Sequence, residues 1–387
     1  MQKIGLLLSY KHPNYGTMLQ AFATQYIVES LGAQTELIDY YSDRFNKHYL
    51  LDYGFFRFLI DTYQSKRKKI NREKCNDIVF QRNIEQRKKS CLEFIQNRLH
   101  SIKKIVGYRD LKKYSNSCSA ILIGSDQKWT PGFSFGVDSS LRFVSKETRT
   151  ISYATSLGVS DYPKRYWKTS RKVWERIDYL SVRENTGARI IKEVCQNKIN
   201  VEVVVDPTYL ITKSEWEKLF PIEQKLKDKY LFCYFLGNNV ESKKSARQYA
   251  DKHGYKLVSV LSNESFSDID QTYADVLLTG ESPDSFINWI RGAECIFTDS
   301  FHGTAFSVIN EKQVYVFYRK NTSVKHQRHS RIDDILSLWN ISNRLITDNS
   351  IDWPEYIENP IDYSKVTPIV LSERDRSLNF IKEAISF

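Results

Sequence analysis

A single histidine lies at the junction of two apolar runs in the stretch CIFTDSFHGTAFSVIN, residues 295–310. The first run is typical of a buried strand, and the run from Thr304 is typical of a helix. A helix N-terminus disfavours a cation and offers free N–H groups to an anion. That setting favours a neutral imidazole able to accept a proton. The spacing therefore predicts His302 as a proton-transfer residue, with Ser300, Gly303 and Thr304 forming the start of the helix around an anion.

Three further polar clusters each follow an apolar run. They are His12, Asn14, Tyr15 and Gly16 after KIGLLLS, Ser125, Asp126 and Gln127 after AILIG, and Arg183 and Glu184 after DYLSV. In open parallel sheets, ligands bind beyond the carboxyl ends of the strands. Each cluster also has a plain structural explanation, as a helix cap, a tight turn or a surface ion pair. Their repeated placement favours one shared site.

A basic loop, YRKNTSVKHQRHSR, follows the apolar run QVYVF. Its cations are Arg319, Lys320, Lys325, Arg328 and Arg331. Beside a helix N-terminus such a loop predicts a phosphate or carboxylate clamp, and the alternative is a solvated charged loop. His326 and His329 have no evident third ligand, so no metal site is expected. The sequence contains no GxGxxG, Walker, HExxH or GxSxG motif, which argues against routine nucleotide, metalloprotease and hydrolase functions.

The elements that position these residues alternate between short apolar strands and longer helical patterns, which indicates parallel α/β architecture. The 387 residues suit two domains. We expect two Rossmann-like doubly wound domains, residues 1–200 and 201–365, that face each other across a cleft. A boundary near Asp206–Pro207, a basic helical insertion at about 49–115 and a C-terminal helix at 366–387, opened by a Ser/Glu cap in SERDRSLNF, complete the prediction.

Composition narrows the class of protein further. The net charge of +11 favours anionic partners or simply a basic surface. Six scattered cysteines without a CxxC pair, and no signal-peptide or membrane-spanning run, predict a cytoplasmic protein. The aromatic segment 53–63, followed by SKRKK, suggests peripheral contact with an anionic membrane at its inner face, or alternatively aromatic packing inside the first domain.

Taken together, these motifs resemble the polysaccharide pyruvyl transferase family over most of the chain. The resemblance is carried by NYGTMLQAFAT at 14–24, GSDQKW at 124–129, ISYATSLG at 151–158, SVRENTGA at 181–188, DPTYL at 206–210 and TDSFHGTAFSVI at 298–309. It implies a GT-B-like arrangement of the two domains. It also implies transfer of pyruvate from phosphoenolpyruvate to two hydroxyls of a sugar as a cyclic ketal, with a galactose-type residue of a surface polysaccharide or its lipid-linked precursor as the expected acceptor.

The resemblance also implies roles for individual residues. His302 is tied to catalysis and Arg183 to phosphoenolpyruvate, and Asp126 is a second candidate for proton transfer. Some members carry an arginine where this chain has Ser300, so Arg319, Arg328 or Arg331 is expected to take its place. Asn14, Tyr15, Ser125 and Gln127 are the expected acceptor contacts. The chemistry requires no cofactor or metal.

Two other functions compete with this reading. A GT-B-type glycosyltransferase with a nucleotide-sugar donor also needs an anion clamp and a base. A nucleic-acid-binding module could use the basic stretch 64–113, but that stretch lacks a recognisable reader motif, so no nucleic-acid partner is expected.

Overall fold

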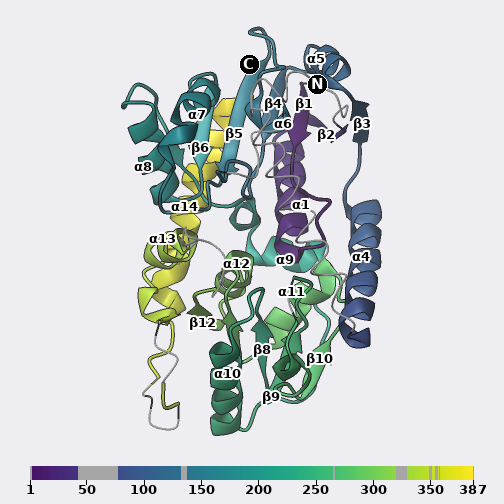
Figure 1. The fold of residues 1–387 in the computed structure, drawn as a ribbon, viewed down its shortest axis with the longest axis vertical. Coiled ribbons are helices and arrows are strands. Elements are labelled where there is room, and N and C mark those ends of the chain that lie inside the picture. The colour runs from purple at the N-terminus through teal and green to yellow at the C-terminus, as the bar shows by residue number, and fades with distance from the viewer. Residues whose placement is uncertain are drawn as a thin grey trace.

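The structure is a computed structural model that describes residues 2–41, 77–131, 137–264, 266–319, 329–347, 351–353, 356 and 358–386. Figure 1 shows two α/β layers of strands and helices, one above the other, with helices between them and along both sides. The aromatic–basic segment at 53–69 lies outside the described residues, as do Lys320, Lys325, His326 and Arg328.

The first sheet has seven parallel strands. Its order is β3 (Ile102–Val106), β2 (Gln34–Tyr41), β1 (Lys3–Leu7), β4 (Ala120–Ile123), β5 (Arg149–Thr155), β6 (Tyr179–Val182) and β7 (Glu202–Val203). Apolar runs such as AILI in β4 are buried throughout, because helices cover both faces of a parallel sheet. The helices after its strands include α1 (Tyr15–Ser30), α5 (Tyr108–Ser115), α7 (Trp167–Trp174) and α8 (Asn185–Val194).

The second sheet repeats this plan with six parallel strands. Its order is β10 (Val276–Leu278), β9 (Lys256–Val260), β8 (Tyr230–Tyr234), β11 (Cys295–Thr298), β12 (Gln313–Phe317) and β13 (Leu345–Ile346). Its helices include α10 (Val240–His253), α11 (Pro283–Gly292), α12 (Phe301–Ile309) and α13 (Ser330–Leu338). The predicted fold class, two parallel α/β sheets, is confirmed.

Each sheet reverses its strand order at one point, where ligands of such folds bind. In the first sheet the reversal lies between β1 and β4, and in the second between β8 and β11. The residues after β4 include Asp126, and α12 with His302 follows β11. Two of the predicted site residues therefore lie at the two reversal points.

The last helix crosses from the second domain to the first. Helix α14 (Tyr363–Ile385) begins beside the second sheet, where the Tyr363 hydroxyl donates to the Lys312 carbonyl at 2.6 Å. It ends on the first domain, where Arg149 donates to the Ala384 carbonyl at 3.0 Å (Figure 1). Asp362 caps its N-terminus, so the helix starts before residue 366 and the predicted Ser/Glu cap lies inside it. The Asp362 side chain accepts from the Ser364 N–H. This is the capping hydrogen bond that the prediction assigned to Ser372, the first residue of SERDRSLNF.

The predicted insertion is shorter than expected. Helix α4 (Ile78–Arg98) ends at Arg98, and Ile102–Val106 is the edge strand β3 rather than a continuation of the helix. Pairing of β3 with β2, and burial of Ile105 in the core of the first domain, override the amphipathic pattern. Strand β3 therefore belongs to the first sheet, and helix α5 belongs to the first domain.

Helix α4 packs on the second domain although it precedes β3 in the chain. The Gly280 N–H donates to Asn83 at 3.1 Å, and Arg87 donates to the Leu261 carbonyl at 2.6 Å. Figure 1 shows α4 running along one side of both layers. Helix α4, from the first half of the chain, thus packs on the second domain, whereas α14, from the second half, ends on the first domain.

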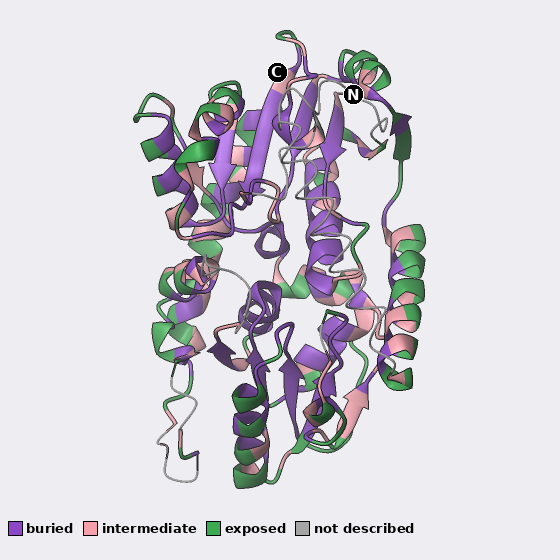
Figure 2. Cartoon of the chain, viewed as in Figure 1, coloured by how far each residue is buried: buried purple, intermediate pink, exposed green. Residues whose placement is uncertain are grey.

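Helix α1 lies in the seam between the domains and is buried along most of its length (Figure 2). Tyr15 at its start stacks on Phe286 of α11 with ring centroids 4.8 Å apart, and Phe22 packs edge-on against Phe220. These contacts belong to one continuous hydrophobic cluster that includes residues of both domains. The ends of α1 and α12 are therefore held against each other by a shared core.

Candidate functional site

His302 lies directly against the first domain because Gly16 of α1 has no side chain. Ser300 caps α12 by accepting from the Gly303 N–H, and His302 in the first turn is only 6% exposed. A Cβ at Gly16 of α1 would lie 2.1 Å from Nδ1 of His302. A glycine at position 16 is thus required for the imidazole to lie directly against α1.

The nearest charged group to the imidazole is Asp206. Its Oδ2 lies 3.6 Å from Nε2 of His302, which is longer than a hydrogen bond but within reach of an ion pair when the ring is protonated. Asp206 follows β7 and begins the 3₁₀ turn η2 (Pro207–Leu210). Among the described residues, Nε2 of His302 has no hydrogen-bond partner. The pair joins the second domain to the end of the first.

Asp206 is held by hydrogen bonds to both of its oxygens. Oδ2 accepts from Ser125 Oγ at 2.6 Å and from Arg183 Nη1 at 2.7 Å, and Oδ1 accepts from the N–H and hydroxyl of Thr208. Burial alone would raise the pKa of this carboxyl. The charges of His302 and Arg183 and the hydrogen bonds outweigh burial, so its pKa is held well below the ordinary value. The carboxylate is therefore ionised and fixed in orientation.

Arg183 links three parts of the site. Besides Asp206 it donates to Ser125 Oγ at 3.0 Å, and its guanidinium lies over the ring of Phe301, the residue before His302, at 4.1 Å. Glu184 Oε2 is 3.8 Å from its Nε. Within the part of the chain that the structure describes, Nε and Nη2 of Arg183 form no hydrogen bond. These two buried nitrogens lack a hydrogen-bond acceptor among the described residues, although Nη2 lies 3.9 Å from Asp126 Oδ1, and the site would have to open for a ligand to supply one.

Asp126 lies at the reversal point of the first sheet with a left-handed φ of +79°. Its Oδ2 accepts from the hydroxyl of Thr17 in α1 at 2.9 Å, and its side chain is 22% exposed. Burial raises its pKa, but the charges of Arg183 and His302 and the hydrogen bonds lower it by more, so its pKa lies below the ordinary value. An ionised carboxylate is a proton acceptor, and it would have to be protonated before it could act as an acid.

Arg331 of α13 reaches the first domain beside Asp126. With the Gln127 amide oxygen turned toward it, that oxygen accepts from Nη1 at 2.7 Å and from Nη2 at 2.9 Å. Burial, followed by repulsion from Arg183 and Arg319, lowers the pKa of Arg331 to about 9. A buried cation that neighbouring cations destabilise would be stabilised by an anion.

Arg319 follows β12 and lies beside Asp299, with Nε 3.8 Å from Oδ2. Asp299 is itself held by the N–H groups of Leu236 and Gly237, both at 2.7 Å. Gly237 is required here, because a Cβ would lie 2.6 Å from the Arg319 side chain. The residues after β8, β11 and β12 thus hold Arg319 at the carboxyl edge of the second sheet, as predicted.

The structure brings most of the predicted residues together. His302, Asp126, Arg183, Ser125, Gln127 and Arg331 are linked by direct contacts, and Ser300, Gly303 and Thr304 form the start of α12. Arg319 forms no such contact with them, but its charge lowers the pKa of Arg331. Asn14 caps α1 by accepting from the Thr17 N–H. Tyr15 and Ser125 have no exposed surface, so neither could contact an acceptor in this conformation. Their acceptor role stays a prediction, and what the structure gives them is packing for Tyr15 and a hydrogen bond to Asp206 for Ser125.

Asp206 is not among the site residues predicted from the sequence, where it lies at the domain boundary and opens the DPTYL motif. The signal that marked the other clusters was present here as well, since Asp206 ends the apolar run VEVVV. Asp206 also precedes Pro207, which is typical of a cap at the start of a turn.

His329 stacks on Tyr318 with centroids 3.9 Å apart. No group of three or more His, Cys, Asp or Glu suited to a metal occurs among the described residues.

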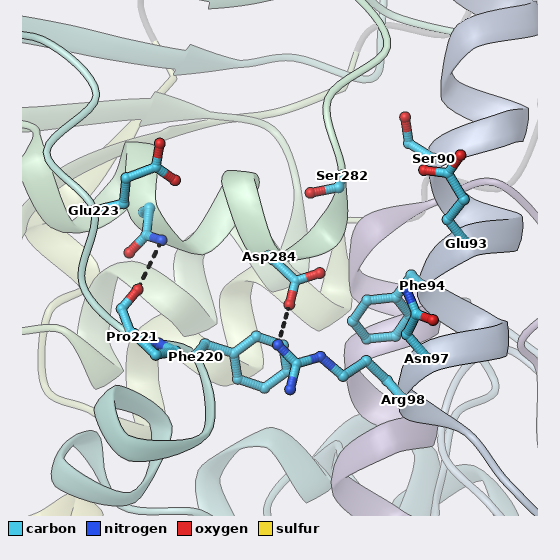
Figure 3. A pocket seen from close by; sticks show the side chains of 11 residues that line it. Ser90, Glu93, Phe94, Asn97, Arg98, Phe220, Pro221, Glu223, Ser282 and Asp284 are labelled. Atoms are coloured by element: carbon cyan, nitrogen blue, oxygen red, sulfur yellow. Dashed lines mark hydrogen bonds and ion pairs between the residues drawn. The ribbon is translucent and has the colours of Figure 1, made fainter.

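A separate polar hollow of about 560 Å³ lies between α4, the residues after α9 (Lys213–Leu219) and α11 (Figure 3). It is lined mainly by polar side chains, and Arg98 pairs with Asp284 across it at 2.8 Å. None of its lining residues belongs to the cluster around His302. In the described segments, no helix is long and apolar enough to span a bilayer.

Comparison with known proteins identifies the sequence through one family model. The model of the family described as polysaccharide pyruvyl transferase matches residues 14–321. This range includes Asn14, Asp126, Arg183, Asp206 and His302, and it ends before Arg331. No curated protein matches the chain.

Solved structures share the fold at very low identity. UDP-GlcNAc 2-epimerase from Methanocaldococcus jannaschii has a TM-score of 0.50 and 10% identity, covering 96% of this chain and 99% of that one. The enzyme of that name from Neisseria meningitidis, bound to UDP-GlcNAc, has a TM-score of 0.47 and 9% identity over 97% and 100%. An alpha-glucosyltransferase in complex with UDP and DNA has 0.44 and 9% over 98% and 95%. At these identities the likeness concerns the GT-B fold alone.

Proposed function

The chain belongs to the polysaccharide pyruvyl transferase family, and from that membership we propose that it transfers pyruvate from phosphoenolpyruvate to two hydroxyls of a sugar. The observation that carries the proposal is the buried His302, whose Nε2 lies beside Asp206 and Arg183 at the seam of the two domains. A proton-transfer group and cations with unbonded N–H groups meet there. The acceptor we propose is a galactose-type residue of a surface polysaccharide or of its lipid-linked precursor.

The donor carries a phosphate and a carboxylate, and the site offers cations for both. Arg331 and Arg319 supply cations, and the N-terminus of α12 offers N–H groups. A planar guanidinium binds either anion through two hydrogen bonds, which lysine does not reproduce. We propose that Arg331, held by Gln127, supplies the charge that Ser300 cannot.

The reaction moves two protons and breaks one bond to phosphate. A proton is added to the methylene carbon of the donor, and the electron-poor carbon that results is attacked by the first sugar hydroxyl. The carbon–oxygen bond to phosphate breaks, the second hydroxyl closes the ring, and inorganic phosphate leaves. One hydroxyl proton ends on the new methyl group and the other on phosphate, so the scheme uses no redox cofactor.

Two groups can carry these protons. His302 is the first, because an imidazole both donates and accepts near neutral pH. Asp126 is the second, because its lowered pKa keeps it ionised and a carboxylate can accept the proton of an attacking hydroxyl. The two sit on different domains, so the reacting carbon would lie between them.

The test is incubation with phosphoenolpyruvate and a panel of galactosides, reading phosphate release and the mass of the product. His302→Asn is the matched inactive control. Thermal stabilisation by phosphoenolpyruvate, and not by nucleotide sugars, supports the donor. Stabilisation by a nucleotide sugar alone, with no phosphate released from phosphoenolpyruvate, would show a glycosyltransferase instead.

We also propose peripheral contact with an anionic membrane, which would bring the enzyme to a lipid-linked acceptor. The support is the aromatic segment 53–63 followed by SKRKK in the sequence. Flotation with anionic and neutral liposomes at low salt tests it. Equal recovery of the protein with both kinds of liposome would remove the idea.

A further inference from the structure

We propose that Asp206 is the positioning residue for His302, holding the imidazole with a proton on Nε2 and stabilising the ring when it becomes protonated. The inference rests on the proposed function, in which His302 transfers a proton. A proton held on Nε2 leaves Nδ1 as the nitrogen that exchanges a proton with the substrate. Gly16 keeps the position beside Nδ1 free of a side chain.

The first support is the rigidity of the carboxylate. Asp206 is 2% exposed, and Ser125, Arg183 and Thr208 donate four hydrogen bonds to its two oxygens. It also begins the buried turn η2, which packs against α1, α12 and α14. A carboxylate fixed in this way sets the orientation of the ring beside it.

The second support is the distance to the imidazole. The gap of 3.6 Å between Oδ2 and Nε2 is about 0.8 Å longer than a charge-assisted hydrogen bond. Catalytic hydrogen bonds are often long in unliganded enzymes and tighten when the substrate binds. Nε2 has no other partner among residues placed by the structure, so Asp206 is the acceptor within closest reach.

Among the described residues, the charged groups of the site lie at η2, after β4 and β6, and on α13, which packs against α12 and carries Arg331. Asp206 faces the ring from the start of η2, Asp126 from the end of β4 and Arg183 from the end of β6. Helix α1 presents Gly16 and the hydroxyl of Thr17, and the latter bonds Asp126. Of the two carboxylates, Asp206 has the ion-pair distance to His302, so its loss should change the charge balance of the ring most.

The arrangement gives Arg183 a second role. Its Nη1 donates to the same Oδ2 that faces His302, so it helps to hold Asp206 as well as offering Nε and Nη2 to a ligand. A substitution at Arg183 is then expected to lower kcat through Asp206 in addition to raising KM for the donor. Arg183→Lys separates the two, since a pure donor clamp would change KM for phosphoenolpyruvate and leave kcat nearly intact.

The main test is the pH profile of Asp206→Asn. Without the carboxylate the protonated ring is less stable, so the alkaline limb of kcat should move to lower pH. We expect kcat to fall at least about tenfold while KM for phosphoenolpyruvate changes less. The control is Asp270→Asn, which removes another buried carboxylate, 5% exposed, paired with Lys243 at 2.5 Å and outside the cluster around His302. The control should keep the wild-type limb, and an unmoved limb in folded Asp206→Asn would overturn the proposal.

A second measurement needs neither activity nor a folded Asp206 variant. Two-bond ¹H–¹⁵N spectra of histidine-labelled wild-type protein report which ring nitrogen carries the proton, and loss of a signal in His302→Asn assigns it among the seven histidines. We expect the Nε2–H form of neutral His302. The Nδ1–H form would refute the role of Asp206. Since no substrate is present, this result stands apart from the failure or success of the proposed reaction.

Discussion

Gly16→Ala adds one carbon at the point where the two domains meet most closely. That Cβ would lie 2.1, 2.2 and 2.5 Å from Nδ1, Cγ and Cβ of His302, and real Cβ contacts essentially never fall below 3.0 Å. The imidazole must therefore move by about 1 Å to restore a normal contact. Asp206 on the far side of the ring and the packing of α12 resist that movement.

The cost can be divided into two parts. Replacing glycine by alanine in a helix is worth up to about 1 kcal/mol in favour of the variant. Overpacking of a buried contact typically costs about 1–3 kcal/mol, and the atoms here are side-chain atoms held on both sides. We expect the free energy of unfolding to fall by about 1–2 kcal/mol. Displacement of a catalytic ring by about 1 Å should lower kcat/KM by about 100-fold.

Denaturant unfolding and steady-state kinetics measure the two effects. The matched control is the same substitution in a His302→Gly background, where the three clashing atoms are absent. There Gly16→Ala should be neutral or stabilising. The reasoning fails if Gly16→Ala in the wild type leaves the unfolding free energy within about 0.5 kcal/mol and kcat/KM unchanged.

His302→Asn keeps the size of the side chain but cannot shuttle a proton, so kcat should fall by about 100- to 10,000-fold with the melting temperature within a few degrees; turnover near the wild-type rate would move the role to another group. Burial, followed by Arg183 and Arg319, lowers the pKa of Arg331 to about 9, so a bound anion should stabilise the cation. Arg331→Met should lose the gain in melting temperature that inorganic phosphate gives the wild type, and an equal gain in both would show that phosphate binds elsewhere. The pKa of Asp206 is lower in the folded protein than in the unfolded chain, so its ionisation contributes to the free energy of unfolding. That contribution is fully present above the unfolded-state pKa of about 4 and is lost as the pH falls through the folded-state pKa. The unfolding free energy of the wild type should therefore decline more steeply in acid than that of Asp206→Asn, and parallel curves would contradict it.

Much of the fold is predictable because parallel strands read as unbroken apolar runs. AILI in β4 and CIFT in β11 are such runs, and polar residues follow each at the same edge of its sheet. That rule places Asp126 at the carboxyl edge of the first sheet and His302 at that of the second, but it does not bring the two edges together. It extends to Arg183 after β6, but it does not say that this cation bonds a carboxylate of its own chain.

Other features depend on contacts that a local pattern does not contain. The stripe Phe80, Asn83, Arg87, Cys91 and Phe94 shows which face of α4 is buried, but not that the second domain buries it. The residue type of an aromatic side chain does not distinguish a ligand contact from a core ring, so the sequence does not show that Tyr15 is buried in the shared core.

The sequence does not mark Asp206 as a site residue, because β7 is only two residues long and the residues after it are typical of a simple turn. Its importance appears only when α12 from the other domain comes to lie beside it. A residue of this kind is recognised by its partners, and those partners are distant in the chain.

The crossing of α14 has a consequence for how the chain is made. Residues of the first domain leave the ribosome early, but the helix that packs on Tyr153 and Tyr179 through Phe380 is synthesised after the described strands of both sheets. The Val205 N–H donates to the hydroxyl of Ser377, which is also synthesised later. During translation the second sheet therefore emerges before α14 can cover the first domain.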